Sequence, residues 1–215
     1  MRIKSSAVWA IPLALLLLLG LGGSRADAAL LPFRIFTTNG QYYDDPGVDL
    51  YVDVRNGGSI VDFIFYNDST VDCSIARIYF DGGSLLSVNS ITNGPGTHFD
   101  KAFPGPGDLP AGNGLILPFV ADGEFTIGAV APPPKNGVNN VPAGEWVKIT
   151  FELSNGGTLE GVLHELYTGD LRVGLHVIGF PDGSSNSAIL VPEPATICLL
   201  GLGGLALLRK HKGQS

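Results

Sequence analysis

The side chains best suited to chemistry are four acids that lie close together in the sequence: Asp62, Asp68, Asp72 and Asp81. Two carboxylates that folding brings together can hydrolyse a glycosidic bond, which would make the protein an exported hydrolase. Their oxygens would also suit calcium, although the full EF-hand pattern is absent. Acidic residues in turns are more often only turn formers. We therefore expect no enzymatic activity and no required cofactor, with calcium left open.

The histidines and the glycine-rich segments do not form a recognisable metal-binding, catalytic or nucleotide-binding motif. His98, His164, His176 and His211 each lack a second histidine or cysteine at metal-ligand spacing. The chain has no G-x-S-x-G and no Walker A sequence, and its G-x-G pairs do not open a helix after a strand. These absences from the sequence argue against hydrolases of the nucleophile-elbow type and against nucleotide binding. His176 is expected to be a partly exposed sheet residue.

Cysteine use favours a core held together without disulfides. Cys73 lies in the middle of the chain and Cys198 in an apolar segment near the C-terminus. An exported chain with so few cysteines must rely on its apolar core. We expect Cys73 to be a small buried hydrophobe.

Exposed aromatic rings offer a second type of function, which is the binding of carbohydrate. Trp146, Tyr42 and Tyr43 could stack on sugar rings, as in a carbohydrate-binding module. This alternative is an analogy at the level of the fold.

The charge distribution separates the middle of the chain from its ends. Residues 29–191 contain seven of the Lys and Arg residues and eighteen of the acids, a formal net charge of −11, whereas the whole chain carries −7. A domain this acidic repels nucleic acid and anionic membrane surfaces. We therefore expect no nucleic-acid partner.

The elements that would position these residues are mostly strands. Residues 48–54 and 145–153 alternate apolar and polar side chains with a period of two. Turn sequences rich in Gly, Asn and Asp separate such segments, which is typical of an antiparallel β-sandwich, here a jelly-roll-like one. Further strands are expected over 33–38, 59–67, 74–80, 85–91, 115–120, 124–130, 171–180 and 187–191.

One short helix is expected in the same domain. Over residues 158–168, Leu159, Val162, Leu163 and Leu166 recur at helical spacing. Thr158 is suited to cap the start of this helix.

The N-terminus reads as an export signal. A basic start precedes an apolar run over 7–21, and Ala26 and Ala28 form an A-x-A cleavage site. We expect a signal peptide over 1–28 and a mature chain that begins at Ala29. An uncleaved N-terminal anchor is the alternative.

The C-terminus combines rigid prolines, an apolar run and a basic end. Residues 195–208 carry no charge and would form a helix of about 21 Å, which is short for a membrane of roughly 30 Å. Cations after the run would stay in the cytoplasm and orient the segment. The residues with these roles are Pro192, Glu193 and Pro194 before the run, and Arg209, Lys210 and Lys212 after it.

This C-terminal pattern resembles the PEP-CTERM sorting signal of Gram-negative bacteria. The resemblance implies recognition by an exosortase, a membrane protease-transpeptidase, with Pro192, Glu193 and Pro194 as the recognition motif. It also implies a link to exopolysaccharide and biofilm matrix. The match concerns sorting and says little about the activity of the sorted domain.

Together these features predict three segments: a signal peptide over 1–28, an extracytoplasmic β domain over 29–190, and a sorting signal with a short transmembrane helix over 191–215. The expected protein is a membrane-tethered precursor that exosortase releases to the cell surface or extracellular matrix of a Gram-negative bacterium. Its partners would be the exosortase, the membrane and exopolysaccharide.

Overall fold

The computed structural model of the chain describes residues 28–101, 108–121, 126–130 and 134–191. The predicted signal peptide, apart from its last residue, and the segment that follows Val191 lie outside these residues. Within the described part of the chain, no helix is long and apolar enough to cross a membrane. The predicted residues outside it are Ala26, Pro192, Glu193, Pro194, Arg209, Lys210 and Lys212.

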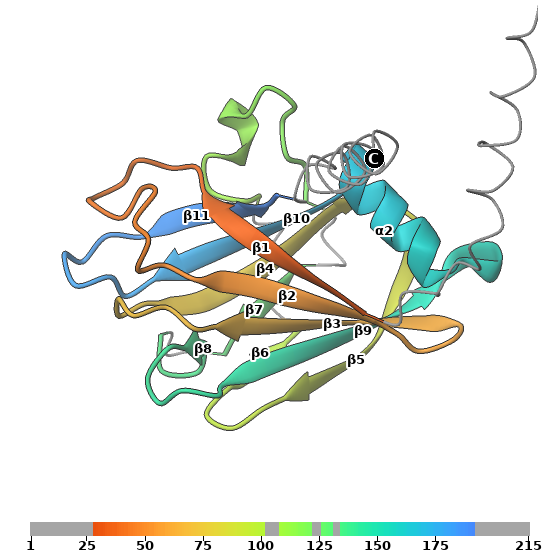
Figure 1. The fold of residues 1–215 in the computed structure, drawn as a ribbon, viewed down its shortest axis with the longest axis horizontal. Helices are drawn as coiled ribbons and strands as arrows, with labels where there is room; N and C mark the ends of the chain where they lie inside the picture. Colours follow the sequence, from red (N-terminus) through yellow and green to blue (C-terminus); the bar gives the residue numbers. More distant parts are fainter. Residues whose placement is uncertain (1–27, 102–107, 122–125, 131–133, 192–215) are drawn as a thin grey trace, which may run out of the picture.

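Five strands form one half of an antiparallel sandwich, which we call sheet A (Figure 1). Their hydrogen-bonded order is β5-β9-β3-β2-β1. The strands are β1 (Ala28–Ile35), β2 (Leu50–Asn56), β3 (Ile60–Asn67), β5 (Leu85–Asn93) and β9 (Trp146–Leu153).

The other half, sheet B, continues from β1 in the order β11-β10-β4-β7-β6, and β8 also pairs with β4. Its strands are β4 (Ser74–Gly82), β6 (Phe99–Asp100), β7 (Ile127–Ala129), β8 (Val138–Asn139), β10 (Leu171–Ile178) and β11 (Asn186–Leu190).

Strand β1 joins the two halves into a single, nearly closed sheet. Its residues up to Pro32 pair with β2, and those from Phe33 onward pair with β11. On the other side, Asn93 at the end of β5 exchanges two hydrogen bonds with the backbone of Phe99 in β6, at 2.7 and 3.2 Å. The predicted antiparallel all-β class is confirmed, while the jelly-roll-like connectivity stays a prediction.

Phenylalanine rings fill the space between the two sheets. Phe80 of sheet B lies 5.3 Å from Phe63 and 4.7 Å from Phe151, both of sheet A, between ring centroids and in edge-to-face arrangements. All three side chains are fully buried. Edge-to-face packing is a favoured geometry for aromatic pairs. The register of the sandwich is thus fixed by rings that meet between the two sheets.

The predicted helix is confirmed as α2 (Leu159–Thr168), the α-helix of the described residues. The Thr158 side chain accepts a hydrogen bond from the Gly161 backbone N–H, at 3.2 Å, and so caps the first turn. Leu159, Val162 and Leu166 are buried in the main core. Short 3-10 turns occur at Gly112–Gly114 and Ser154–Gly156.

The strand expected over 115–120 is wrong, because this segment belongs to a loop that covers the outer face of sheet B. Pro118 has no N–H to offer a ladder. Leu109 and Phe119 instead pack on Tyr79 of β4 in a second apolar cluster. The loop needs Gly174 beneath it, since a Cβ there would lie 2.6 Å from a methyl carbon of Leu109.

Truncation of the central ring should destabilise the whole sandwich. We expect Phe80→Ala to lower the free energy of unfolding by about 3–5 kcal/mol, because it removes a buried ring and leaves a cavity. Chemical denaturation monitored by circular dichroism measures this change.

Tyr43→Ala is the matched control, since this ring is 47% exposed. Its effect should stay within about 0.5 kcal/mol. Similar losses in both variants would contradict the central role of Phe80.

Candidate functional site

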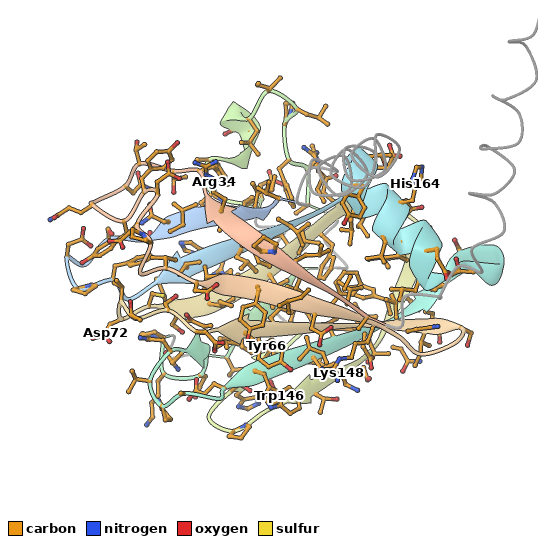
Figure 2. The ribbon with its side chains drawn as sticks, viewed as in Figure 1. Arg34, Tyr66, Asp72, Trp146, Lys148 and His164 are labelled. Carbon is orange, nitrogen blue, oxygen red and sulfur yellow. The ribbon has the colours of Figure 1, made fainter. Side chains whose placement is uncertain are left out.

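A row of aromatic side chains crosses the outer face of sheet A. Tyr51 of β2 lies opposite Tyr66 of β3, and Tyr66 lies opposite Trp146 of β9. The rings of Tyr51 and Tyr66 stack with centroids 5.1 Å apart and planes 20° from parallel. Figure 2 shows Tyr66 and Trp146 on these neighbouring strands. We call Tyr51, Tyr66 and Trp146 the aromatic row.

The row forms because each strand alternates inward and outward residues. In β3, Phe63 and Phe65 point into the core, so Tyr66 faces outward. Cross-strand neighbours then bring the three rings into line, and pairs of this kind stabilise a sheet. All three rings are half-buried, which leaves part of each ring accessible to a ligand.

Local contacts hold the two outer rings in place. The Tyr51 hydroxyl donates a hydrogen bond to the Asp68 carboxylate, at 2.7 Å. Trp146 lies against Gly94, whose backbone N–H donates a hydrogen bond to the Trp146 carbonyl at 3.0 Å. The contact is close, because a Cβ added at Gly94 would lie 2.8 Å from the indole ring. The row is therefore a preorganised surface, and binding would cost little ordering of its side chains.

A shallow hollow continues the row beyond Tyr51. It is lined by Leu30, Pro32, Asp49, Tyr51 and Asp68. The hollow thus combines two apolar residues, Leu30 and Pro32, with carboxylates that accept hydrogen bonds from hydroxyl groups, as Asp68 does from Tyr51.

Charged pairs border the row on the same face. Lys148 of β9, labelled in Figure 2, lies 3.3 Å from Asp62 of β3, measured from Nζ to Oδ2. Asp62 also accepts a hydrogen bond from the Thr150 hydroxyl. The Arg55 guanidinium lies 2.6 Å from Asp53 on β2. Polar groups beside aromatic rings are the composition of sites that bind sugars, which have both apolar C–H faces and hydroxyl edges.

The protonation state of Tyr51 follows from its surroundings. Burial raises its pKa above the ordinary value, and the hydrogen bond to Asp68 and the negative charge of that carboxylate raise the pKa further. The phenol therefore stays neutral and remains a hydrogen-bond donor across the physiological range.

Of the three rings predicted to stack on glycans, only Trp146 lies in the row. Tyr42 stacks on Phe180, with centroids 4.8 Å apart, and packs against the core. It lines a different hollow, which contains Arg34 and Asp44. Tyr43 is an exposed loop residue. The stacking role itself stays a prediction.

Sequence reasoning missed Tyr51 and Tyr66, although the signal was present. Within the alternating segment over 48–54, Tyr51 shares the polar side with Asp49 and Asp53. Tyr66 lies in the mostly apolar segment over 59–67, where the sequence does not show which residues face the core. Only the pairing of β2, β3 and β9 shows that both rings lie beside Trp146.

The four acids proposed for catalysis are not brought together. Phe63 and Phe80 meet in the core, so their neighbours Asp62 and Asp81 face outward on opposite sheets. Asp62 is paired with Lys148 and Asp81 with Arg172. Asp68 accepts the Tyr51 hydroxyl, and Asp72 is exposed. Among the described residues, no group of three His, Cys, Asp or Glu side chains could hold a metal ion.

The other residues considered in the sequence analysis lie in the strands, the helix and the core. His176 is half-buried on β10, and its pKa is lowered by burial and by the positive charge of Arg77. His164 is exposed on α2 (Figure 2). Cys73 is a free, buried cysteine, as expected for a small hydrophobic residue of the core. Burial raises the pKa of its thiol. Of the cleavage-site residues, Ala28 and Ala29 begin β1 opposite Arg55 and Val54.

Comparison with known proteins identifies one region. The PEP-CTERM protein-sorting motif matches residues 190–212. This match confirms the resemblance seen in the sequence, and it marks an exported protein that exosortase processes at the membrane. No curated protein and no solved structure was found to match the chain.

The raised pKa of Tyr51 can be tested by measuring the free energy of unfolding at alkaline pH. The folded state holds the phenolic proton more tightly than the unfolded state, so the free energy of unfolding should fall as pH rises above about 10. Tyr51→Phe should lose this part of the pH dependence. Asp68→Ala should retain a smaller part, because burial of the ring remains.

Denaturant titrations at a series of pH values measure both effects. An unchanged alkaline slope in Tyr51→Phe would contradict the assignment.

Proposed function

Because the chain carries the PEP-CTERM protein-sorting motif at residues 190–212, we propose that its β domain is a non-enzymatic cargo that exosortase delivers to the cell surface or extracellular matrix. In this proposal the protein acts in the exopolysaccharide or biofilm layer of a Gram-negative bacterium. The sorting motif is the observation that carries the proposal.

The layout of the chain supports this proposal. Strand β11 ends at Leu190, where the matched motif begins. The last backbone hydrogen bond of the sheet runs from the Val191 N–H to the Pro32 carbonyl, at 3.1 Å. Cleavage after this point would remove the sorting signal and leave every strand intact. Release would then yield a folded domain.

The sorting motif can be tested by its central acid. Glu193→Ala should block removal of the C-terminal segment while export continues, because the variant keeps the apolar run and its basic end. Mass spectrometry of the protein from its native host reports both trimmed ends.

Thr196→Ala, which lies just outside the Pro-Glu-Pro motif, is the matched control and should be processed normally. Equal removal of the segment in Glu193→Ala and in the unmodified chain would refute the motif as the recognition element.

A second candidate function is the binding of polysaccharide by the aromatic row. The supporting observation is the stacked pair Tyr51 and Tyr66 in register with Trp146, bordered by Asp62 and Lys148. Successive rings along a flat face suit the C–H faces of consecutive sugars. The net charge of −11 over residues 29–191 favours a neutral or amino-sugar polymer over a polyuronate, which it would repel.

Loss of a ring should weaken this binding. We expect Trp146→Ala and Tyr66→Ala each to reduce the affinity for a neutral polysaccharide roughly tenfold, about 1.4 kcal/mol, with an unchanged circular dichroism spectrum. Affinity electrophoresis in gels that contain a neutral glucan, a chitosan or a polyuronate measures retention.

Tyr51→Phe keeps the ring and should retain binding, and Tyr43→Ala, which lies outside the row, should behave like the unmodified chain. Equal retention of Trp146→Ala and the unmodified protein, or no retention on any of the three polymers, would count against the glycan site.

A further inference from the structure

The loop over sheet B exposes three aliphatic side chains within five residues of sequence. Ile116 is 107% exposed, Leu117 61% and Val120 65%. We call these three residues the apolar tip. In Figure 1 the loop stands above β1 and β11, on the side of the molecule opposite β9 and β5. Several large apolar side chains exposed on one short loop suit contact with a partner or a membrane.

The apolar tip is held in a defined position. The Arg172 guanidinium on β10 donates hydrogen bonds to the carbonyls of Leu117 and Pro118, at 2.7 and 2.6 Å. The same group pairs with Asp81 and lies 5.2 Å from the centroid of the Phe119 ring. The exposure of the tip is thus built into the fold, since three contacts of Arg172 with the loop hold it in a position that leaves its aliphatic side chains outside.

The anchor lies beside the point where the chain leaves the sheet. Gly174 of β10 is opposite Ile189 of β11, and β11 ends one residue later at Leu190. Arg172 precedes Gly174 by two residues on β10, so it lies near the end of β11. Three residues link Val191 to the apolar run over 195–208. When this link is fully extended, the distance from Val191 to the start of the run is at most about 14 Å. A membrane that holds this run would therefore lie close to the apolar tip.

We propose that the apolar tip inserts into the interface of the bilayer while the sorting segment tethers the precursor. The tip would fix the orientation of the domain and hold the Pro-Glu-Pro motif at the membrane surface, where exosortase acts. Aliphatic side chains in the interface gain from burial of apolar surface, without any need for anionic lipid. The inference rests on the proposed membrane placement of residues 195–208.

The test uses the full chain in vesicles of neutral phosphatidylcholine brominated close to the headgroup. Both natural tryptophans, Trp9 and Trp146, are replaced by phenylalanine, and a single reporter is introduced by Leu117→Trp. We expect brominated lipid to reduce the reporter emission to about half, since interfacial side chains lie within several ångströms of the bromines. Val141→Trp is the matched control, because Val141 is an aliphatic loop residue that is 70% exposed beside the start of β4.

The outcomes separate the tip from the tether. Vesicle flotation tests the tether, and a chain that does not float would overturn both the membrane placement and this inference. A chain that floats with an unquenched reporter at 117, or with equal quenching at 117 and 141, would overturn the apolar tip alone. Adding Ile116→Ser and Val120→Ser to the reporter chain should abolish the quenching, and persistence of the quenching would also contradict the proposal.

Discussion

Packing of phenylalanine rings between the two sheets is the constraint on which the rest of the structure depends. Phe80 contacts Phe63 and Phe151 across the sandwich, so the inward residues of three strands are fixed together. Since side chains alternate along a strand, fixing the inward set also fixes the outward set. A shift of one residue would bury Tyr66 and expose Phe65. The aromatic row is therefore a consequence of the core.

The two outer faces of the sandwich differ in how far they are covered. The outer face of sheet B is covered by the loop that contains Leu109 and Phe119, which pack on Tyr79. The outer face of sheet A keeps half-buried rings and charged pairs at its surface. This asymmetry follows from Gly174, which leaves room for Leu109, and from Arg172, which binds the loop carbonyls. The open face is the one available to a ligand.

The aromatic row and the apolar tip belong to different sheets of the molecule. The aromatic row crosses β2, β3 and β9 of sheet A. The loop that carries the apolar tip is bound by Arg172 of sheet B and stands above β1 and β11 (Figure 1). A precursor held at the membrane through the side that carries the tip would present the row to the surrounding matrix. Sorting and ligand binding could thus proceed without competing for one surface.

The sequence alone determined the features that depend on local pattern. Short apolar or alternating segments between turn sequences predicted most strands, and helical spacing with Thr158 predicted α2. The Pro-Glu-Pro motif with its apolar run predicted the sorting signal, because each of these signals is complete within a short segment. Tertiary structure decided what depends on pairing between distant strands. It placed Tyr51 and Tyr66 beside Trp146, sent Asp62 and Asp81 to opposite faces, and turned the apolar segment over 115–120 into a loop. These arrangements result from strand register and from the packing of the core, which join residues far apart in the chain and leave no mark in any single stretch of it.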